Sequence, residues 1–218
     1  SVGIIGSLQR KFLQRVKANT ERMGAMLDDL IRITTLDTGR MQLEPERVDV
    51  AFAIEEAVTG VANQFREKDL ILRLALAPAF PPLTADRDAL LQMLSHLLSN
   101  AALASPVGGE VQVTAGVRRD VVPSLDGGER ETDCLHVAIE DSGGGIAEED
   151  IERVFARKYR ADNPLIEGLG DTGVSLSLAK ALVDAHSGRI WLESQPDVGT
   201  TFHVLLPLDV ERFEGDQP

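Results

Sequence analysis

The sequence contains a single cysteine and no long apolar run, and both absences narrow the classes of protein to which it can belong. Cys134 has no second cysteine for an intramolecular disulfide, which fits a protein of a reducing compartment. No apolar stretch approaches the ~20 residues that a membrane-spanning helix needs, and no signal-peptide pattern opens the chain. We therefore expect a cytoplasmic chain with no membrane contact of its own, and leave open whether a parent protein is tethered to a membrane.

Positive charge is also scarce. The chain has 22 lysines and arginines against 35 aspartates and glutamates, which gives a formal net charge of −13. Because a chain this acidic has no general field for holding a polyphosphate backbone, we expect no nucleic-acid partner. Its 218 residues, 43% hydrophobic and 26% charged, have an ordinary globular composition and can bury a core. One domain, or one domain with an appendage, is expected.

The first forty residues carry one long helical pattern. Apolar side chains and threonines recur at steps of three and four, at Phe12, Val16, Thr20, Met23, Leu27, Leu30 and Thr34. Such a seam is typical of a coiled coil or helical bundle, and Gly39 and Pro45 mark its end. The helix could pack on its own domain or on a helix of a second molecule. We favour the second interpretation, because the seam is long and lies at the end of the chain.

From about residue 45 onward, the pattern changes to alternating helices and strands. Helices are expected over residues 54–65, 87–104, a short stretch from 148, and 173–187. Strands are expected over residues 70–76, 111–117, 135–139, 190–194 and 201–206. Asp86 is placed to cap the second helix, and the prolines, glycines and charges of residues 120–133 predict a hairpin loop.

A carboxylate occupies the buried register of one predicted strand. Leu135, Val137 and Ile139 alternate inward, and Asp141 takes the next inward position at the end of that strand. A buried carboxylate is costly unless it receives hydrogen bonds. Residues 143–146 follow with three glycines, which let a ligand approach the backbone closely. Turns use the same residues, so a ligand site and a plain turn are both open on this pattern alone.

Two further features are ambiguous when taken alone. His96 and Asn100 lie four residues apart on the side of their helix opposite its leucines, with Leu103 beside them. They could line a covered site or an ordinary solvent face. Gly168, Gly170 and Gly173 lie at the start of the helix predicted over residues 173–187, and free N–H groups at a helix N-terminus bind anions. Glycines before a helix are equally common in loops.

Taken in chain order, five segments resemble the motifs of one family, the catalytic domain of sensor histidine kinases. The segments are LSHLLSNAALASPVGGEVQV (94–113), IEDSGGGI (139–146), VFARKYR (154–160), DTGVSLSLAKALVDAHSGRIWLES (171–194) and GTTF (199–202). They resemble, respectively, the asparagine box with its strand, the first glycine box, the phenylalanine box, the second glycine box with its helix, and the final strand. Residues 12–50 resemble the second helix of the family's dimerisation hairpin and the linker after it.

This resemblance implies a fold and a division of the chain. The family belongs to the ATPase superfamily that also contains gyrase, MutL and the large heat-shock chaperones. The expected fold is an α/β (α+β) two-layer sandwich of the Bergerat type, with a mixed sheet and helices packed on one face, preceded by a long dimerisation helix. Residues 1–43 would be the remnant of the dimerisation domain, 44–210 the ATP-binding catalytic domain, and 211–218 a polar tail.

The resemblance also implies roles for individual residues, with ATP and Mg²⁺ as cofactors. Asn100 corresponds to the magnesium-binding asparagine, and Asp141 to the aspartate that accepts a hydrogen bond from the adenine amino group. Arg160 corresponds to a basic residue that reaches the phosphates, and His96 is a candidate for polarising the nucleophile. The other residues expected to bind the nucleotide are Gly143, Gly145, Ile146, Gly170, Thr172, Gly173 and Thr201.

The chain departs from the family pattern in four places. The second glycine box, usually Gly-x-Gly-x-Gly, has Asp171 and Ser175 at its outer glycine positions, and Leu103 replaces a residue that is often lysine. The four histidines are followed by Leu, Val, Ser and Val, so none has the His-Glu or His-Asp pattern of a phosphoacceptor. We therefore expect the phosphoacceptor helix to be absent here, before Ser1, and no autophosphorylation in cis.

Three functions follow from this reading. The first is a catalytic domain that transfers the γ-phosphate of ATP to a histidine for two-component signalling, with a homodimer through helix 12–34 and a response regulator receiver domain as partners. The second is a pseudokinase, in which a degenerate second glycine box leaves a dimerising or regulatory module. The third is a mechanical ATPase similar to gyrase or MutL, against which the preceding helix and linker argue.

Overall fold

The computed structural model describes residues 6, 9–10, 12–13, 15–16, 20, 23–24, 43–124, 127–156 and 175–208. The chain divides into two compact units, Ser1–Met41 and Gln42–Pro218. Within the described ranges, no helix is both long and apolar enough to cross a membrane.

The first unit is helical at nine of its described residues, which are 9–10, 12–13, 15–16, 20 and 23–24. The Thr20 hydroxyl donates to the Val16 carbonyl at 3.0 Å, a bond that threonine makes inside helices. Phe12, Val16 and Met23 of the predicted seam are exposed, with 69%, 46% and 64% of their surface accessible. Leu27, Leu30 and Thr34, the other residues of the predicted seam, lie outside the described part of the chain.

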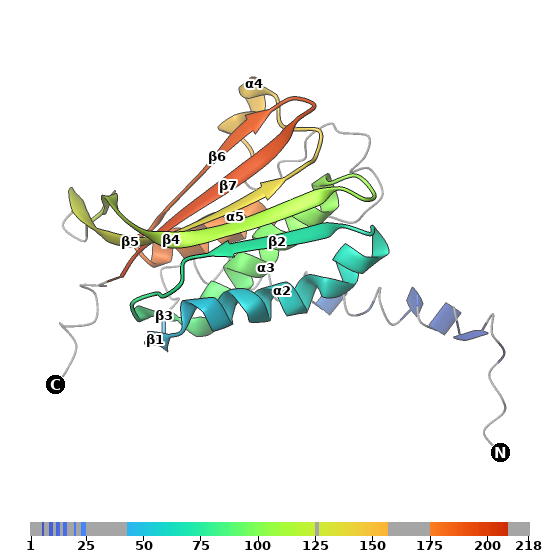
Figure 1. Ribbon diagram of the computed structural model, residues 1–218, viewed down its shortest axis with the longest axis horizontal. Helices are drawn as coiled ribbons and strands as arrows, with labels where there is room; N and C mark the ends of the chain where they lie inside the picture. Colours follow the sequence, from blue (N-terminus) through green and yellow to red (C-terminus); the bar gives the residue numbers. More distant parts are fainter. Residues whose placement is uncertain are drawn as a thin grey trace, which may run out of the picture. The chain divides into compact units, whose positions relative to one another are not determined.

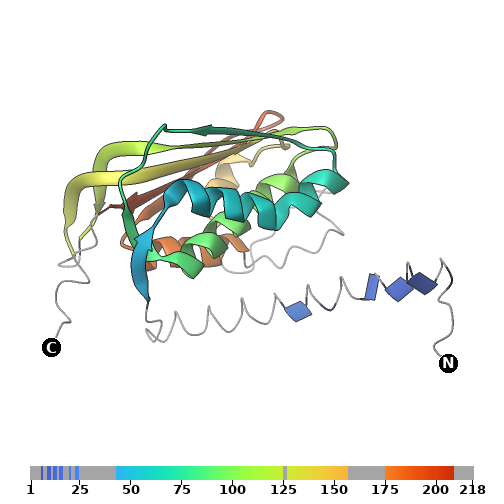
Figure 2. The same cartoon turned by 60° about the horizontal axis from the view of Figure 1, so that its bottom comes forward.

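The second unit is a sandwich of a mixed sheet and a layer of helices (Figures 1 and 2). In spatial order the strands are β2 (Ile71–Leu76), β4 (Glu110–Pro123), β5 (Glu129–Asp141), β7 (Gly199–Pro207) and β6 (Arg189–Gln195). β2 runs parallel to β4, and the other neighbours are antiparallel. Helices α2 (Val50–Glu67), α3 (Arg87–Ala104) and α5 (Ser175–Ala185) cover one face, as Figure 2 shows. The predicted fold class is confirmed.

The core lies between the two layers because the strands alternate. Val113, Ile139 and Phe202 are direct neighbours across β4, β5 and β7, and each is at most 1% exposed. α3 turns its leucines toward these side chains, with Leu94, Leu97 and Leu98 at most 2% exposed. The two-residue period of the strands thus meets the helical period of α3 in one apolar layer.

The N-terminus of α3 forms where the sequence predicts it. The Asp86 side chain accepts a hydrogen bond from the Ala89 N–H at 2.9 Å, which is the geometry of an N-cap. At the other end of α3, the Lys68 ammonium donates to the carbonyls of Ala102, Leu103 and Ser105. A cation on these last carbonyls satisfies orphan acceptors and the negative end of the helix dipole, so α3 is fixed at both ends.

Two parts of the fold differ from the sequence-based expectation. The hairpin predicted at residues 120–133 is present, but its loop is shorter than predicted, because β4 continues to Pro123 and β5 begins at Glu129. The charges that suggested a loop lie on strands, where Arg118 pairs with Asp120 at 2.7 Å. A second, two-stranded sheet of β1 (Pro45–Val48) and β3 (Leu83–Asp86) was not predicted. Short strands beside prolines carry little periodic signal.

Candidate functional site

The centre of the site is Asp141, the last residue of β5. Its inward position follows from the alternation of Val137 and Ile139, and only 3% of its surface is exposed. One carboxylate oxygen, Oδ1, accepts from the Gly143 N–H at 2.8 Å. The other, Oδ2, is buried and has no hydrogen-bond partner among the described residues. Since an unmet buried acceptor is costly, this oxygen points to a ligand that donates a hydrogen bond.

The protonation of Asp141 reflects this environment. Burial raises the pKa of the carboxyl to about 6, while the N–H of Gly143 and, more weakly, that of Thr200 lower it. The neighbouring Glu140 charge adds a small increase. A donor placed on Oδ2 would favour the ionised form, so ligand binding and proton release at this residue are linked.

The backbone after Asp141 admits no side chain at two positions. A Cβ on Gly143 would lie 2.7 Å from Asp141 Oδ1 and 2.9 Å from the Ala104 carbonyl oxygen. Gly145 has φ +71, and a Cβ there would lie 2.2 Å from the Gln195 carbonyl oxygen. Both contacts are far shorter than real Cβ contacts, so only glycine fits. The loop is therefore pressed between the end of α3 and the β6–β7 turn.

A serine fastens the same loop to the sheet. Ser194 Oγ accepts from the Ile146 N–H at 2.8 Å and donates to the Gly199 carbonyl at 3.0 Å. Because that bond uses the serine's only hydrogen, the Thr200 hydroxyl, 2.9 Å away, must be the donor to Ser194. Sequence reasoning missed Ser194, although it follows Ile190 and Leu192 in the inward register, the signal that identified Asp141.

The structure corrects the position expected for Thr201. Thr201 pairs with Glu140 and Glu193 on the face of the sheet opposite to Asp141. Thr200 is the direct neighbour of Asp141 and is 4% exposed. Since successive strand residues point to opposite faces, a shift of one position moves the side chain across the sheet. The threonine on the same face as Asp141 is Thr200.

The remaining predicted residues fall into two groups. His96 and Asn100 are half-buried on α3, two turns and one turn, respectively, before Ala104, whose backbone and Cβ abut Gly143. The structure thus places Gly143, which binds Asp141, against the end of the helix that carries Asn100, whereas Gly145 and Ile146 contact β6. Four other predicted residues, Arg160, Gly170, Thr172 and Gly173, lie outside the described part of the chain, as does Asp171.

The described residues contain no group of three or more His, Cys, Asp or Glu side chains that could hold a metal ion. The described residues therefore contain no metal site whose ligands all come from such side chains. The Asn100 amide oxygen is a hard ligand of the type that Mg²⁺ accepts. Mg²⁺ usually keeps several waters and binds one or two protein groups together with substrate phosphates, which fits a single asparagine.

We predict that Asp141→Asn stabilises the ligand-free chain at alkaline pH. The folded pKa of about 6 exceeds the ordinary 3.8, so stability from the protonated carboxyl is present below pH 3.8 and lost as pH rises through 6. The neutral amide should raise the free energy of unfolding by about 1–2 kcal/mol at pH 8 and by about half as much at pH 5, because the unfolded carboxyl is already ionised there. Urea unfolding at both pH values measures this. Glu55→Gln, an exposed position on α2 with the same charge change, is the control. An equal effect of Asp141→Asn at both pH values would contradict the prediction.

Comparisons with known proteins point to one family. The model of the histidine kinase-, DNA gyrase B- and HSP90-like ATPase family matches residues 85–210. The sensor histidine kinase WalK of Bacillus subtilis (strain 168) is 30% identical over 213 residues, covering 93% of this chain and 31% of WalK. The sensor-like histidine kinase SenX3 of Mycobacterium bovis (strain ATCC BAA-935 / AF2122/97) is 30% identical over 208 residues, covering 95% of this chain and 47% of SenX3. The chain thus spans less than half the length of either relative.

A solved structure supports the same fold. Full-length ShkA in complex with AMPPNP superposes with a TM-score of 0.73 at 19% identity, covering 95% of this chain and 40% of that one. The family match spans more than half of the chain and includes Asp141, Gly143 and Gly145. The chain therefore belongs to the histidine kinase-, DNA gyrase B- and HSP90-like ATPase family, and the relatives that it resembles are sensor histidine kinases.

Proposed function

We propose that the second unit binds ATP with Mg²⁺ and transfers the γ-phosphoryl group to a histidine on a dimerisation helix, as a step of two-component signalling. The observation that carries the proposal is the buried Asp141 Oδ2, an acceptor with no partner in the described residues. A 6-amino group of adenine supplies the donor that this oxygen lacks. Gly143 and Gly145 keep the adjacent backbone free of side chains.

Metal binding rests on Asn100 in this proposal. Its amide oxygen would bind Mg²⁺ together with phosphate oxygens and water, and the ion would neutralise charge on the phosphates. α3 is held at its N-terminus by the Asp86 cap and at its C-terminus by Lys68. Fixed ends favour a constant position for Asn100, which positioning catalysis requires.

Phosphate binding is assigned to the N-terminus of α5 and the segment before it. Gly170, Thr172 and Gly173 would bring backbone N–H groups to the phosphates, and Arg160 would add a positive charge. In the transfer itself, an imidazole nitrogen attacks the γ-phosphorus while the bond from that phosphorus to the leaving oxygen of ADP breaks. His96 lies one helical turn before Asn100 and is our candidate for polarising the attacking imidazole.

We assign residues 1–43 to the dimerisation domain, 44–210 to the catalytic domain and 211–218 to a tail. The exposed Phe12, Val16 and Met23 support a homodimer through helix 12–34, because an apolar seam of this kind is stable when a partner helix covers it. The other proposed partners are the phosphoacceptor helix and a response regulator receiver domain. Since the proposed reaction consumes ATP, we place it in the cytoplasm.

A pseudokinase remains the second candidate, on one specific observation. Asp171 puts a carboxylate, and Ser175 a Cβ, at positions where the family has glycine. A carboxylate near the phosphates opposes their charge, and a Cβ limits how closely the backbone approaches. A mechanical ATPase has no comparable observation in its favour, and the relatives described above carry sensor kinase names.

We predict that Asp141→Asn weakens ADP binding by about 1–3 kcal/mol, the contribution of a charge-assisted hydrogen bond in a buried site. The amide would also place a second donor opposite the adenine amino group. Titration calorimetry with ADP and Mg²⁺ measures the change, with the exposed Glu55→Gln of α2 as the charge-matched control. Equal affinity of a folded Asp141→Asn variant and the parent chain would refute the adenine assignment.

We predict that Asp171 and Ser175, in the second glycine box, lower the affinity of the chain for ATP. Changing both Asp171 and Ser175 to glycine should strengthen ATP binding by roughly 3–30-fold and ADP binding less, because the carboxylate and the Cβ act on the phosphates. The double variant should also phosphorylate a dimerisation domain supplied in trans. Asp69→Gly removes one negative charge at an exposed left-handed position and is the control. Strong preference for ATP together with phosphorylation by the parent chain would eliminate the pseudokinase.

A further inference from the structure

Asp86 joins three separate elements of the second unit. Its Oδ1 accepts from the Ala89 N–H in the first turn of α3, and its Oδ2 accepts from the Glu44 N–H, each at 2.9 Å. Its own backbone N–H donates to His186 Nε2 at 3.2 Å. One residue therefore connects the segment before β1, the start of α3 and the residue that follows α5.

The segment that includes Glu44 links the two units of the chain. It enters β1, which pairs with β3 in an antiparallel register from Pro45↔Asp86 to Val48↔Leu83. Because Asp86 ends β3 and caps α3, the seating of this linker strand and the start of α3 depend on the same carboxylate. Each oxygen serves one element, so neither bond replaces the other.

His186 acts as a rigid spacer in this junction. It is 4% exposed, and its Nε2 must accept, because the Asp86 N–H can only donate. The proton of the neutral ring therefore sits on Nδ1, which donates to the Leu182 carbonyl at 2.8 Å. Burial lowers the pKa of His186, in keeping with a neutral ring. The end of α5 is thus held at a fixed distance from the start of α3.

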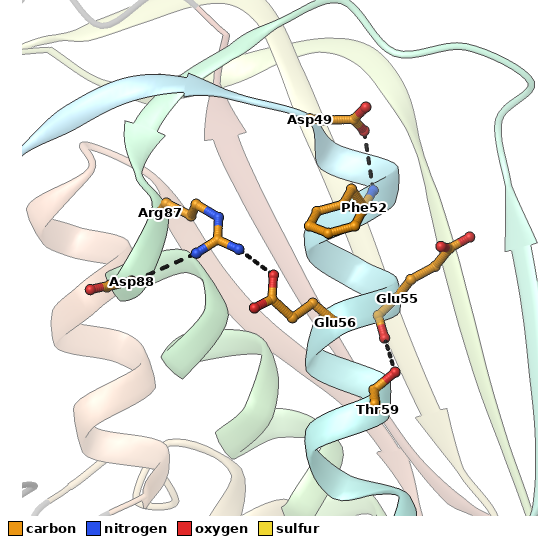
Figure 3. Close-up of polar contacts among 7 residues, drawn as sticks. All are labelled: Asp49, Phe52, Glu55, Glu56, Thr59, Arg87 and Asp88. Carbon is orange, nitrogen blue, oxygen red and sulfur yellow. Dashed lines mark hydrogen bonds and ion pairs between the residues drawn. The ribbon is translucent and has the colours of Figure 1, made fainter.

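The start of α2 is tied to the same region, as Figure 3 shows. Arg87, the first residue of α3, forms an ion pair with Glu56 of α2. Asp49, directly after β1, caps α2 by accepting from the Phe52 N–H at 3.1 Å. Any movement of β1 therefore acts on the first turns of both helices.

We propose that Asp86 is a positioning residue, which couples the seating of the linker strand β1 to the spacing between α3 and α5. The inference rests on the proposed function, in which α3 carries Asn100 and the N-terminus of α5 receives the phosphates. Displacing β1 removes one of the bonds to the Asp86 carboxylate and changes how α3 sits against α5. Nucleotide affinity in the second unit thus depends on the state of the linker.

Two substitutions in the 218-residue chain test this coupling from opposite ends. Asp86→Ser keeps a helix-capping oxygen for Ala89, but a single short hydroxyl cannot also reach Glu44. Glu44→Pro removes the N–H donor, and Glu44→Ala, which keeps it, is the matched control. We expect the first two to weaken ADP–Mg²⁺ binding by about 3–10-fold each, and the double variant no further than either alone. Glu44→Ala should bind as the parent chain does.

Measuring both the nucleotide affinity and the urea midpoint separates a positioning role of Asp86 from a general effect on stability. The Glu44 bond is exposed at the surface, so Glu44→Pro should lower the urea midpoint little while changing affinity. Additive losses in the double variant, or a lower midpoint with unchanged affinity, would overturn the coupling. If the parent chain binds no nucleotide, the proposed function fails, and amide exchange decides instead. Glu44→Pro must then speed exchange at His186 and Gly188 as well as at Ala89, and unchanged exchange at His186 overturns the proposal.

Discussion

The candidate site of the second unit depends on one physical constraint, the unfavourable free energy of burying the Asp141 carboxylate. Asp141 lies in an apolar register and keeps one oxygen without a partner in the described residues, which raises its pKa to about 6. A packed core could remove this cost by shifting a neighbouring donor into place or by admitting a different side chain. The surrounding backbone has glycine where no side chain fits, at residues 143, 145 and 199, and we propose that the unpartnered oxygen accepts from a ligand.

Three glycines allow the backbone to pack closely around Asp141. Gly143 and Gly145 allow the loop to turn tightly against the end of α3 and the β6–β7 turn. Gly199 has φ +148, and a Cβ there would lie 2.0 Å from the Asp141 carbonyl oxygen. Ser194 then ties the loop to the sheet through Ile146 and Gly199. The unpartnered oxygen of Asp141 lowers the stability of the ligand-free chain, and in the proposed function a ligand supplies the missing donor.

Local patterns in the sequence predicted much of this. Asp86 was identified as a cap because its effect is confined to one helical turn, and Asp141 because strand alternation has a strict period of two. The same period explains the error at Thr201, where a motif matched one residue out of register puts the side chain on the other face. The contact between Asp86 and His186 spans a hundred positions and leaves no local trace, so only the folded chain reveals it. The loop of the β4–β5 hairpin was predicted too long because exposed strands tolerate the charges that usually mark loops.

In the proposed function, recognition of the base and binding of the phosphates depend on different segments of the chain. Asp141 and its glycines form one rigid cluster at the end of β5, whereas Asp171 and Ser175 belong to a different segment. The direct measurement of the central claim is a calorimetric comparison of ADP with inosine diphosphate, which carries a keto oxygen in place of the 6-amino group. If Asp141 Oδ2 accepts from that amino group, ADP binds at least about 10-fold more tightly, because the keto oxygen would face a carboxylate. Equal affinity for the two nucleotides would contradict the account.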